Sequence, residues 1–367
     1  MKKIVVNLLL VVAAVTVSLL GLEFSMALIA PRPLRVTTAE WAFFLRFDPD
    51  LGWRNRAGAE GVYRPAPGIP ATTVRINAGG YRGGAYPPGG KPGGFRTAIL
   101  GDSNTFGYGV EESDRFSDII ASSFKADSDL LNFGVFGYGT DQEAILLERE
   151  LLGYRPNLVI LAISAGDLSD VTASISGGTA KPFFTIDEGM LTLHNTPVPE
   201  RTPYMRNRWC RSDALTTLYR HSHLFRLVSD RLLPVSRYMT NTVHEMDENE
   251  GLRVMVSLIQ EMNGLCAAGH ARFAVMLIPH GVWLAGAKTM PGQPVGYYAA
   301  LGRALTNSGI PYLDLTPGLL AADTPGRPVF FAEDPVHLTP YGNRVVAGEL
   351  ARFLAGEQLL KRRDGRR

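Results

Sequence analysis

The chain is organised around the stretch Ala98-Ile99-Leu100-Gly101-Asp102-Ser103-Asn104-Thr105-Phe106-Gly107-Tyr108-Gly109-Val110. An apolar run from Thr97 to Leu100 has the composition of a buried strand, and it ends in Gly-Asp-Ser and a glycine-rich turn. In an open α/β sheet, side chains just past the carboxyl end of a strand face the functional crevice. A serine at that place, with small neighbours that leave it room, is a candidate nucleophile. Ser103 is therefore the first candidate site residue.

Predicted strands and helices alternate along much of the chain. Apolar runs of strand type lie at 130–135, 158–163, 272–278 and 311–315. The run at 158–163 is continuous, as expected for a central parallel strand that is buried on both faces. Helical spacing of apolar residues predicts helices at 115–124, 141–152, 252–267, 296–307 and 341–355. This order predicts an α/β fold with right-handed crossovers and a doubly wound sheet.

Residues 170–250 interrupt this alternation of predicted strands and helices. Two apolar runs flank Asp187-Glu188-Gly189 and predict a β-hairpin, residues 201–211 are basic and loop-like, and residues 214–233 have an amphipathic helical pattern. We interpret the segment as an insertion beside the crevice, where substrate selectivity would be set, rather than as an independently folding domain.

Composition limits the classes of function. At 367 residues, with 46% apolar residues, the chain can form one large domain or two modest ones. A net charge of +2 does not support general nucleic-acid binding. The histidines outside the motifs described below lack partners at metal-ligand spacing, so we expect no metal site and no cofactor. Cys210 and Cys266 are either two ordinary thiols or a pair formed in an oxidising compartment.

The first thirty residues have the pattern of a membrane anchor. Lys2 and Lys3 precede residues 4–22, which carry no formal charge and are long enough for one helix to cross a bilayer. A cleaved signal peptide is the alternative, although its apolar region is usually shorter. The two lysines favour a cytoplasmic N-terminus, which Arg32 and Arg35 weaken without reversing. We therefore expect a single-pass protein of the bacterial inner membrane, with its bulk in the periplasm.

Two segments flank the predicted α/β domain. Residues 31–95 become rich in Gly, Pro and Arg and are interpreted as a leader packed on that domain, with one short strand at 74–77. The aromatic run at 41–47 would lie near the membrane surface or pack on the domain. At the other end, residues 356–367 form a basic polar tail, most simply a solvated one.

A second candidate feature precedes the last predicted helix. It reads Asp334-Pro335-Val336-His337-Leu338-Thr339-Pro340-Tyr341-Gly342. Histidine is the side chain best suited to take a proton from serine near neutral pH, and a carboxylate three residues earlier in a turn can orient its ring. Asp334 and His337 are therefore the expected partners of Ser103, although a histidine before a helix can also simply contribute to its cap.

These motifs resemble blocks of one known family. Gly-Asp-Ser-x-Thr-x-Gly-x-Gly, which begins at Gly101, is similar to the first block of the SGNH (GDSL-type) hydrolases, and Asp334-x-x-His337 is similar to their last block. The resemblance covers about residues 96–355. It implies a flavodoxin-like three-layer α/β/α fold with a five-stranded, mostly parallel sheet of order 2-1-3-4-5. Segments 48–53 and 76–82 are also similar to those upstream of membrane-anchored members.

The resemblance also implies an oxyanion hole, from which one donor is missing. Gly137 takes the place of the family's oxyanion-hole glycine, and the backbone N–H of Ser103 would be a second donor. Where the family has an asparagine before the aspartate that aligns with Asp167, this chain has Gly166. Ser164, Gln142 or a water can replace the lost side chain, or Gly166 can offer only its backbone N–H with diminished activity. Alternatively, the site has drifted to another acyl reaction or to none.

The sequence thus predicts a serine-dependent ester hydrolase or O-acyltransferase. Its expected location favours envelope substrates, such as acylated glycans or lipids. His280 follows a predicted strand and would face the crevice, either to contact substrate or as part of the loop. The alternative function is a catalytically weak or inactive module that binds an envelope glycan. The pattern does not indicate an oligomeric state.

Overall fold

The computed structural model describes residues 2–29, 44–63, 65, 68–87, 94–124, 128–176, 179–199, 218, 221–232, 242–284, 286, 289–290, 293–294 and 297–360. Its centre is a five-stranded sheet, and all of the pairings between neighbouring strands are parallel. The strands are β5 (Arg96–Gly101), β6 (Asp129–Gly134), β7 (Leu158–Ser164), β13 (Arg272–Ile278) and β16 (Tyr312–Asp314). They lie in the order β16-β13-β7-β5-β6, so the expected order 2-1-3-4-5 is confirmed.

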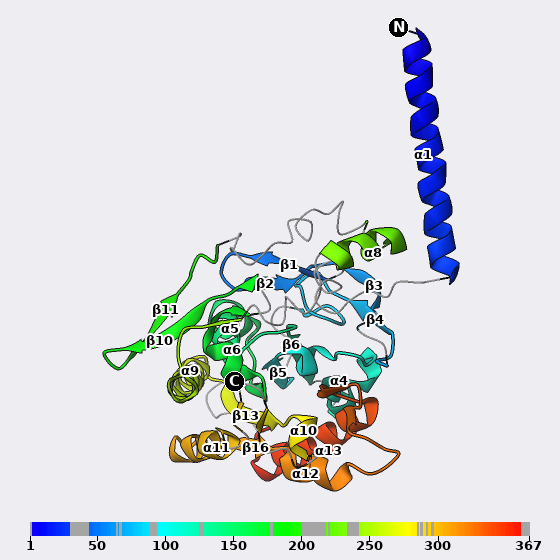
Figure 1. The fold of residues 1–367 in the computed structure, drawn as a ribbon. Helices are drawn as coiled ribbons and strands as arrows, with labels where there is room; N and C mark the ends of the chain where they lie inside the picture. Colours follow the sequence, from blue (N-terminus) through cyan, green and yellow to red (C-terminus); the bar gives the residue numbers. More distant parts are fainter. Residues whose placement is uncertain are drawn as a thin grey trace.

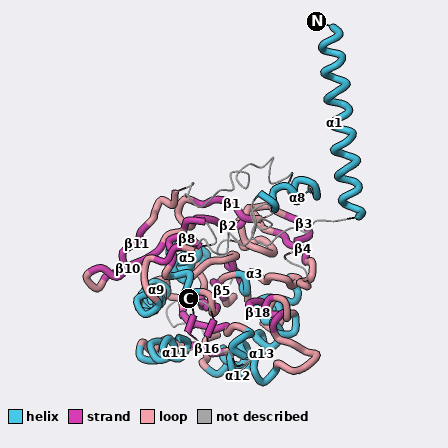
Figure 2. The backbone as a smooth tube through the Cα atoms, in the orientation of Figure 1, coloured by secondary structure: helices cyan, strands magenta, loops and turns pink. Residues whose placement is uncertain are grey.

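Helices cover both faces of the sheet, as Figures 1 and 2 show. Alternate side chains of β7 enter two separate cores: Val159, Leu161 and Ile163 enter one, whereas Leu158 and Ile160 enter the other. The first core is shared with α5 (Thr140–Arg149), α9 (Glu248–Ala268) and α11 (Tyr297–Asn307). The second is shared with α4 (Phe116–Ala121), α12 (Thr316–Ala322) and α13 (Pro340–Gly356). Burial on both faces explains why the central strand reads as a continuous apolar run.

Capping residues place the helix boundaries that apolar spacing leaves uncertain. Asp247 accepts a hydrogen bond from the N–H of Glu250, so α9 begins four residues before the predicted start at 252. Thr339 caps α13 in the same way, with Pro340 in the first turn. After α5 the chain continues as a short 3₁₀ helix, η2 (Leu151–Tyr154), so the predicted helix at 141–152 is two elements.

The segment before the α/β domain forms two β-hairpins that share the first core. They consist of β1 (Leu45–Asp48) with β2 (Gly52–Asn55), and β3 (Glu60–Tyr63) with β4 (Thr72–Arg75). Phe44, Trp53 and Tyr63 are buried there, and the Trp53 indole donates to the carbonyl of Phe136 at 2.8 Å. The expectation of a single short strand at 74–77 was wrong in number and in bounds: the described part of the segment has four strands, and β4, which overlaps the predicted one, ends at Arg75. Of the aromatic run at 41–47, residues 44–47 pack on the domain, and residues 41–43 lie outside the described residues.

The insertion forms small elements beside α9. After α6 (Asp167–Val171), strands β8 (Ala173–Ser176), β9 (Thr179–Ala180) and β12 (Val243–His244) make a three-stranded sheet. The predicted hairpin is confirmed as β10 (Phe183–Asp187) and β11 (Met190–His194). The amphipathic pattern at 214–233 contains α8 (His223–Leu232), which begins after Ser222. The basic loop at 201–211, with Cys210, lies outside the described residues.

Short elements complete the α/β domain. They are α3 (Ser103–Phe106), η1 (Glu112–Asp114), α10 (Gly281–Leu284), β14 (Thr289–Met290), β15 (Gln293–Pro294), β17 (Phe330–Phe331) and β18 (Asp334–Leu338). Of the two cysteines, Cys266 is a buried free thiol.

Helix α1 (Lys2–Ile29) projects from this body (Figure 1). It is the one helix in the described part of the chain that is long and apolar enough to cross a membrane, with a mean hydropathy of 2.6, and no part of that window is buried. A signal sequence near the N-terminus has the same properties.

Candidate active site

The candidate nucleophile lies at the tip of the central sheet. Strand β5 ends at Gly101, and Ser103 is the first residue of the single-turn helix α3. Asp102 caps this helix, because its carboxylate accepts a hydrogen bond from the N–H of Asn104 at 2.8 Å. The turn requires a glycine at position 101, where a Cβ would lie 2.1 Å from Oγ1 of Thr105. Asp102 thus has a structural role, and the turn presents Ser103 beyond the carboxyl edge of the sheet.

Ser103, His337 and Asp334 form one chain of hydrogen bonds. The serine Oγ lies 2.8 Å from Nε2 of His337, and Nδ1 of the same ring lies 2.8 Å from Oδ2 of Asp334. Asp334 and His337 lie on β18, which pairs with β17, so the turn expected at 334–337 is a short strand. The arrangement fits a serine whose base is held in one orientation by a carboxylate.

The surroundings of Asp334 favour its ionised form. Burial alone would raise the pKa of this carboxyl, but the hydrogen bond and charge of His337, the N–H of Val336 and the hydroxyl of Tyr108 outweigh burial and lower the pKa. Tyr108 also stacks on the His337 ring, with 3.8 Å between centroids and 24° between planes. Sequence reasoning missed Tyr108, whose one signal was its place in the glycine-rich turn after the serine.

Asn104 ties the serine turn to the histidine strand, and sequence reasoning missed it as well. Its amide nitrogen donates to the carbonyl of Val336 at 3.2 Å and to Oγ of Ser164 at 3.3 Å. Its carbonyl oxygen accepts from the N–H of Leu338 at 3.3 Å. One side chain therefore fixes β18 against α3 and holds His337 in reach of Ser103.

Of the expected oxyanion donors, the backbone N–H groups of Ser103 and Gly137 are available, whereas the side chains named as substitutes are not. Gly137 has φ of +72°, which favours glycine, and no described residue accepts a hydrogen bond from its N–H or from that of Ser103. Gly166 is the N-cap of α6 and brings no side chain. Gln142 is not a free substitute, because its amide nitrogen donates to the carbonyl of Leu51 at 2.7 Å. Ser164 is engaged as well, since it hydrogen-bonds Asn104 and Asp102.

His280 lies at the corner between β13 and α10, close to the histidine strand. A Cβ on the adjacent Gly281 would lie 2.9 Å from the carbonyl oxygen of Pro335. Nδ1 of His280 accepts a hydrogen bond from the N–H of Val282 at 3.1 Å, so the proton of the neutral ring is assigned to Nε2. Burial lowers the pKa of His280, the charge of Asp334 opposes this shift, and His337 adds to it. The lowered pKa therefore keeps the ring neutral at pH values where an ordinary histidine is partly protonated.

Comparison with known families agrees with this geometry. The model of the GDSL-like Lipase/Acylhydrolase family matches residues 99–345, which includes the serine turn and the histidine strand. The chain belongs to this family. Membership of this family makes the protein an ester hydrolase. It also confirms the resemblance from which we predicted the fold.

Solved structures of several esterases and lipases are similar to this GDSL-like hydrolase. An acetyl xylan esterase, AlAXEase, is 13% identical, with 70% of this chain and 98% of that chain covered and a TM-score of 0.42. A lipolytic protein of the G-D-S-L family from Veillonella parvula is 13% identical, covering 70% and 97%, with a TM-score of 0.40. LAE5, from the metagenome of Lake Arreo, is 16% identical, covering 76% and 100%, with a TM-score of 0.41. A search of the curated proteins finds no match.

A cluster of buried carboxyl groups lies behind the serine turn of this GDSL-like hydrolase. Asp141 forms a buried ion pair with Lys181, whereas neither carboxyl oxygen of Glu143 has a hydrogen-bond partner among the described residues. Burial raises the pKa of Glu143 and of Asp167 well above the usual range, and the neighbouring carboxylates add to both shifts. Both groups therefore keep their protons to a higher pH than ordinary carboxyl groups do. No group of three or more His, Cys, Asp or Glu side chains in the described residues is arranged to hold a metal ion.

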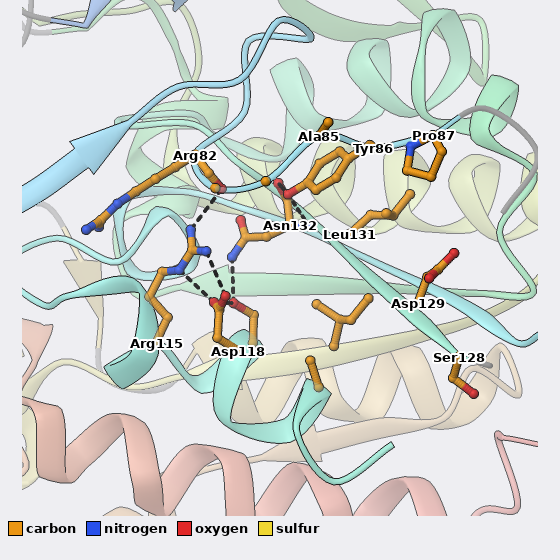
Figure 3. Close-up of a pocket in the computed structure, with 15 residues that line it drawn as sticks. Arg82, Ala85, Tyr86, Pro87, Arg115, Asp118, Ser128, Asp129, Leu131 and Asn132 are labelled. Atoms are coloured by element: carbon orange, nitrogen blue, oxygen red, sulfur yellow. Dashed lines mark hydrogen bonds and ion pairs between the residues drawn. The ribbon is translucent and has the colours of Figure 1, made fainter. Parts of the chain in front are cut away.

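A cavity of about 270 Å³ lies apart from Ser103, His337 and Asp334, at the outer edge of β6 (Figure 3). Arg115 crosses it to Asp118, with Nε at 2.7 Å from the carboxylate. Tyr86 closes the strand edge, because its hydroxyl both donates to the carbonyl and accepts from the N–H of Asn132 at 2.9 Å. These polar groups bond to one another, and none of Ser103, His337 and Asp334 lines the cavity.

Proposed function

We propose that Ser103 is the nucleophile of this ester hydrolase, with His337 as general base and then acid and Asp334 as the residue that orients it. The observation that carries the proposal is the unbroken chain of two 2.8 Å hydrogen bonds from the serine Oγ through the imidazole to the carboxylate. The lowered pKa of Asp334 supports it, because an ionised carboxylate stabilises the imidazolium that forms when His337 takes the proton.

The proposed reaction has two steps. The Ser103 oxygen attacks the ester carbonyl carbon while its proton passes to Nε2 of His337, and the tetrahedral intermediate collapses as His337 returns that proton to the departing alcohol. A water molecule then attacks the acyl-serine, with His337 again taking and returning the proton. If an acceptor hydroxyl replaces that water, the same chemistry becomes O-acyl transfer.

Stabilisation of the oxyanion is the weaker part of the proposed site. The N–H groups of Ser103 and Gly137 are the proposed donors, and Gly166 would add at most its backbone N–H. Loss of one donor typically lowers the rate about a hundredfold or more. We therefore propose that the enzyme is slow unless a group of the substrate replaces the missing donor. His280 is proposed to contact substrate through Nε2–H.

Location narrows the proposed substrate class. We propose that α1 anchors the chain in the bacterial inner membrane, with residues 96–355 as the periplasmic hydrolase domain, 31–95 as a leader packed on it, about 170–250 as an insertion and 356–367 as a basic tail. Lys2 and Lys3 favour this orientation. Ester substrates of the envelope, such as acylated glycans or lipids, would then be within reach.

Hydrolysis of p-nitrophenyl acetate by the full chain in detergent tests the proposal. Ser103→Ala and His337→Ala should each lower kcat by at least about a thousandfold, whereas the matched control Ser122→Ala, on an exposed serine, should leave it unchanged. Adding soluble sugar acceptors separates transfer from hydrolysis through the acylated product. A folded wild-type chain without turnover between pH 6 and 9 would favour the glycan-binding alternative.

A further inference from the structure

The hairpin of β1 and β2 is fastened to the turn that carries Gly137. The indole N–H of Trp53, on β2, donates to the carbonyl oxygen of Phe136 at 2.8 Å, and the Tyr138 hydroxyl donates to the carbonyl oxygen of Trp53 at 2.5 Å. Cζ2 of the same indole lies 3.6 Å from the position that a Cβ on Gly137 would take. Trp53 therefore contacts all three residues of the turn, and it is only 5% exposed.

The turn at 135–138 has the features of a type II β-turn. The N–H of Tyr138 donates to the carbonyl oxygen of Val135 at 3.3 Å. Gly137 has φ of +72°, whereas Phe136 before it has a negative φ. Type I and type II turns differ mainly in the orientation of their central peptide unit, and glycine at the third position is compatible with both. Here that unit consists of the Phe136 carbonyl and the Gly137 N–H, so a contact from outside the turn is needed to fix its direction.

The hydrogen bond from the indole acts on this same peptide unit. In a trans peptide the C=O and N–H bonds point in opposite directions, so the bond that holds the Phe136 oxygen against Trp53 also points the Gly137 N–H away from the indole. A carbonyl that accepts a hydrogen bond also polarises its amide, which strengthens the N–H as a donor. No described residue accepts a hydrogen bond from this N–H. It is therefore both oriented and available.

The other bonds between the hairpin and this region do not touch that peptide unit. The side chain of Gln142 donates to the carbonyl of Leu51 at 2.7 Å and accepts from the N–H of Gly139 at 3.3 Å. These bonds hold the turn in place without setting the direction of its central N–H. A buried indole needs some acceptor, but Trp53 takes the one carbonyl that shares a peptide unit with a proposed oxyanion donor.

We propose that Trp53 is a positioning residue of the oxyanion hole, whose indole N–H holds the Phe136–Gly137 peptide unit so that the glycine N–H faces the reacting carbonyl. The inference rests on the proposed catalysis by Ser103 with Gly137 as an oxyanion donor. The orientation of one backbone donor matters more here than in a site with three donors, because Gly166 brings no side chain to share the charge.

The position of Trp53 in the chain gives the segment before the hydrolase domain a role in catalysis. The family model matches residues 99–345, so Trp53 lies 46 positions before the matched part of the chain. On this proposal, the β1–β2 hairpin supplies part of the catalytic geometry, in addition to packing on the core.

Trp53→Phe in the full chain tests this role, because phenylalanine keeps an aromatic ring and removes the indole N–H. We expect kcat for p-nitrophenyl acetate to fall roughly tenfold with KM within about twofold of the wild type, which is less than the hundredfold or more that loss of a whole donor costs. Trp53→benzothienylalanine, introduced by nonsense suppression, replaces the N–H with sulfur in a ring of nearly the same shape. It should give the same loss, and it measures the effect even where the phenylalanine variant fails to fold.

The matched control is Arg54→Met, at the next position of β2. This substitution removes the 2.6 Å ion pair of Arg54 with Glu150, another contact of the hairpin with the domain, and leaves the indole in place. It should leave kcat unchanged.

Inhibition by a methyl trifluoromethyl ketone separates donor orientation from a general loosening of the site. The Ser103 oxygen adds to the ketone carbon while the serine proton passes to His337, so the adduct carries an oxyanion as the transition state does. Its Ki should rise in both Trp53 variants by the same roughly tenfold factor by which kcat/KM falls, and should stay at the wild-type value in Arg54→Met.

The outcomes separate this inference from the function on which it rests. A folded wild-type chain without turnover that depends on Ser103 overturns both. Wild-type turnover with unchanged kcat in the benzothienylalanine variant overturns the role of Trp53 alone. A lower kcat with an unchanged Ki for the ketone also overturns it, because the loss would not arise at the oxyanion. An equal loss in Arg54→Met would assign the effect to packing of the hairpin and overturn it as well.

Discussion

Gly166→Asn tests whether the oxyanion site limits the rate of this hydrolase. The backbone of Gly166 has φ of −72° and ψ of −26°, values that any L-residue adopts. A Cβ there would find Oδ2 of Asp170 at 3.7 Å as its nearest neighbour, an ordinary contact. Replacing a glycine in such a conformation also lowers the conformational entropy of the unfolded chain, so the variant should fold at least as stably as the wild type.

The expected gain follows from the value of one donor. A side-chain donor in an oxyanion hole contributes about 2.7–4 kcal/mol, a hundredfold to a thousandfold in kcat. Asp170 competes for the new amide, because its Oδ2 lies beside the substituted position. We therefore expect an increase in kcat of roughly ten- to a hundredfold, or about 1.4–2.7 kcal/mol.

Steady-state hydrolysis of p-nitrophenyl acetate at pH 7.5 measures this gain, with Gly166→Ala as the matched control. Alanine adds the same Cβ without a donor and should leave kcat within about twofold of the wild type. An unchanged kcat in the asparagine variant would show that another group already supplies the donor. An equal gain in both variants would assign the effect to the N-terminus of α6 rather than to the oxyanion.

Three further substitutions test the electrostatics of the site. Asp334→Asn should lower kcat by about 10⁴-fold, because an amide cannot stabilise the imidazolium. Burial raises the pKa of Asp170 to about 6, against the opposing charge of Lys181, so Asp170 is ionised at pH 8 and protonated at pH 5. Asp170→Asn should therefore raise kcat roughly fivefold at pH 8, by removing about 1 kcal/mol of repulsion near Gly166, and change it little at pH 5. Because the pKa of Glu143 is raised, this carboxyl keeps its proton in the folded chain at pH values where it has lost that proton in the unfolded chain. Urea unfolding should show Glu143→Gln gaining stability over the wild type by about 1.4 kcal/mol for each pH unit between the pKa of Glu143 in the unfolded chain and its raised pKa in the folded chain.

Each of these expectations has a result that would contradict it. Full activity in Asp334→Asn would mean that His337 needs no carboxylate partner. The same effect of Asp170→Asn at both pH values would assign it to packing rather than charge. A stability difference between Glu143→Gln and wild type that does not change with pH would show that Glu143 is ionised in the folded state.

Much of the fold could be predicted because the physical cause is local. The run at 158–163 is apolar at every position since β7 is buried on both faces, and its neighbours alternate with helices of clear amphipathic spacing. The Asp334 and His337 pair could be found because the two lie three positions apart, although the strand that carries them depends on pairing with β17 and was expected as a turn.

Contacts across the chain could not be predicted from the sequence. The four strands before residue 76 are short and lie among glycines and prolines, and they are stabilised by burial of Phe44, Trp53 and Tyr63 in a distant core. Gln142 seemed close enough to replace the missing asparagine, but its partner is Leu51, 91 positions away. Asn104 likewise acts on residues more than two hundred positions distant, for which a single sequence carries no signal.

Covalent labelling of Ser103 is the most direct test of the catalytic assignment. A fluorophosphonate transfers its phosphonyl group to an activated serine oxygen with loss of fluoride, and mass spectrometry of the digested chain locates the adduct. We expect one adduct, on the peptide that contains Ser103, and its loss in His337→Ala. An adduct on a different serine, or no adduct on a chain shown to be folded, would contradict the assignment.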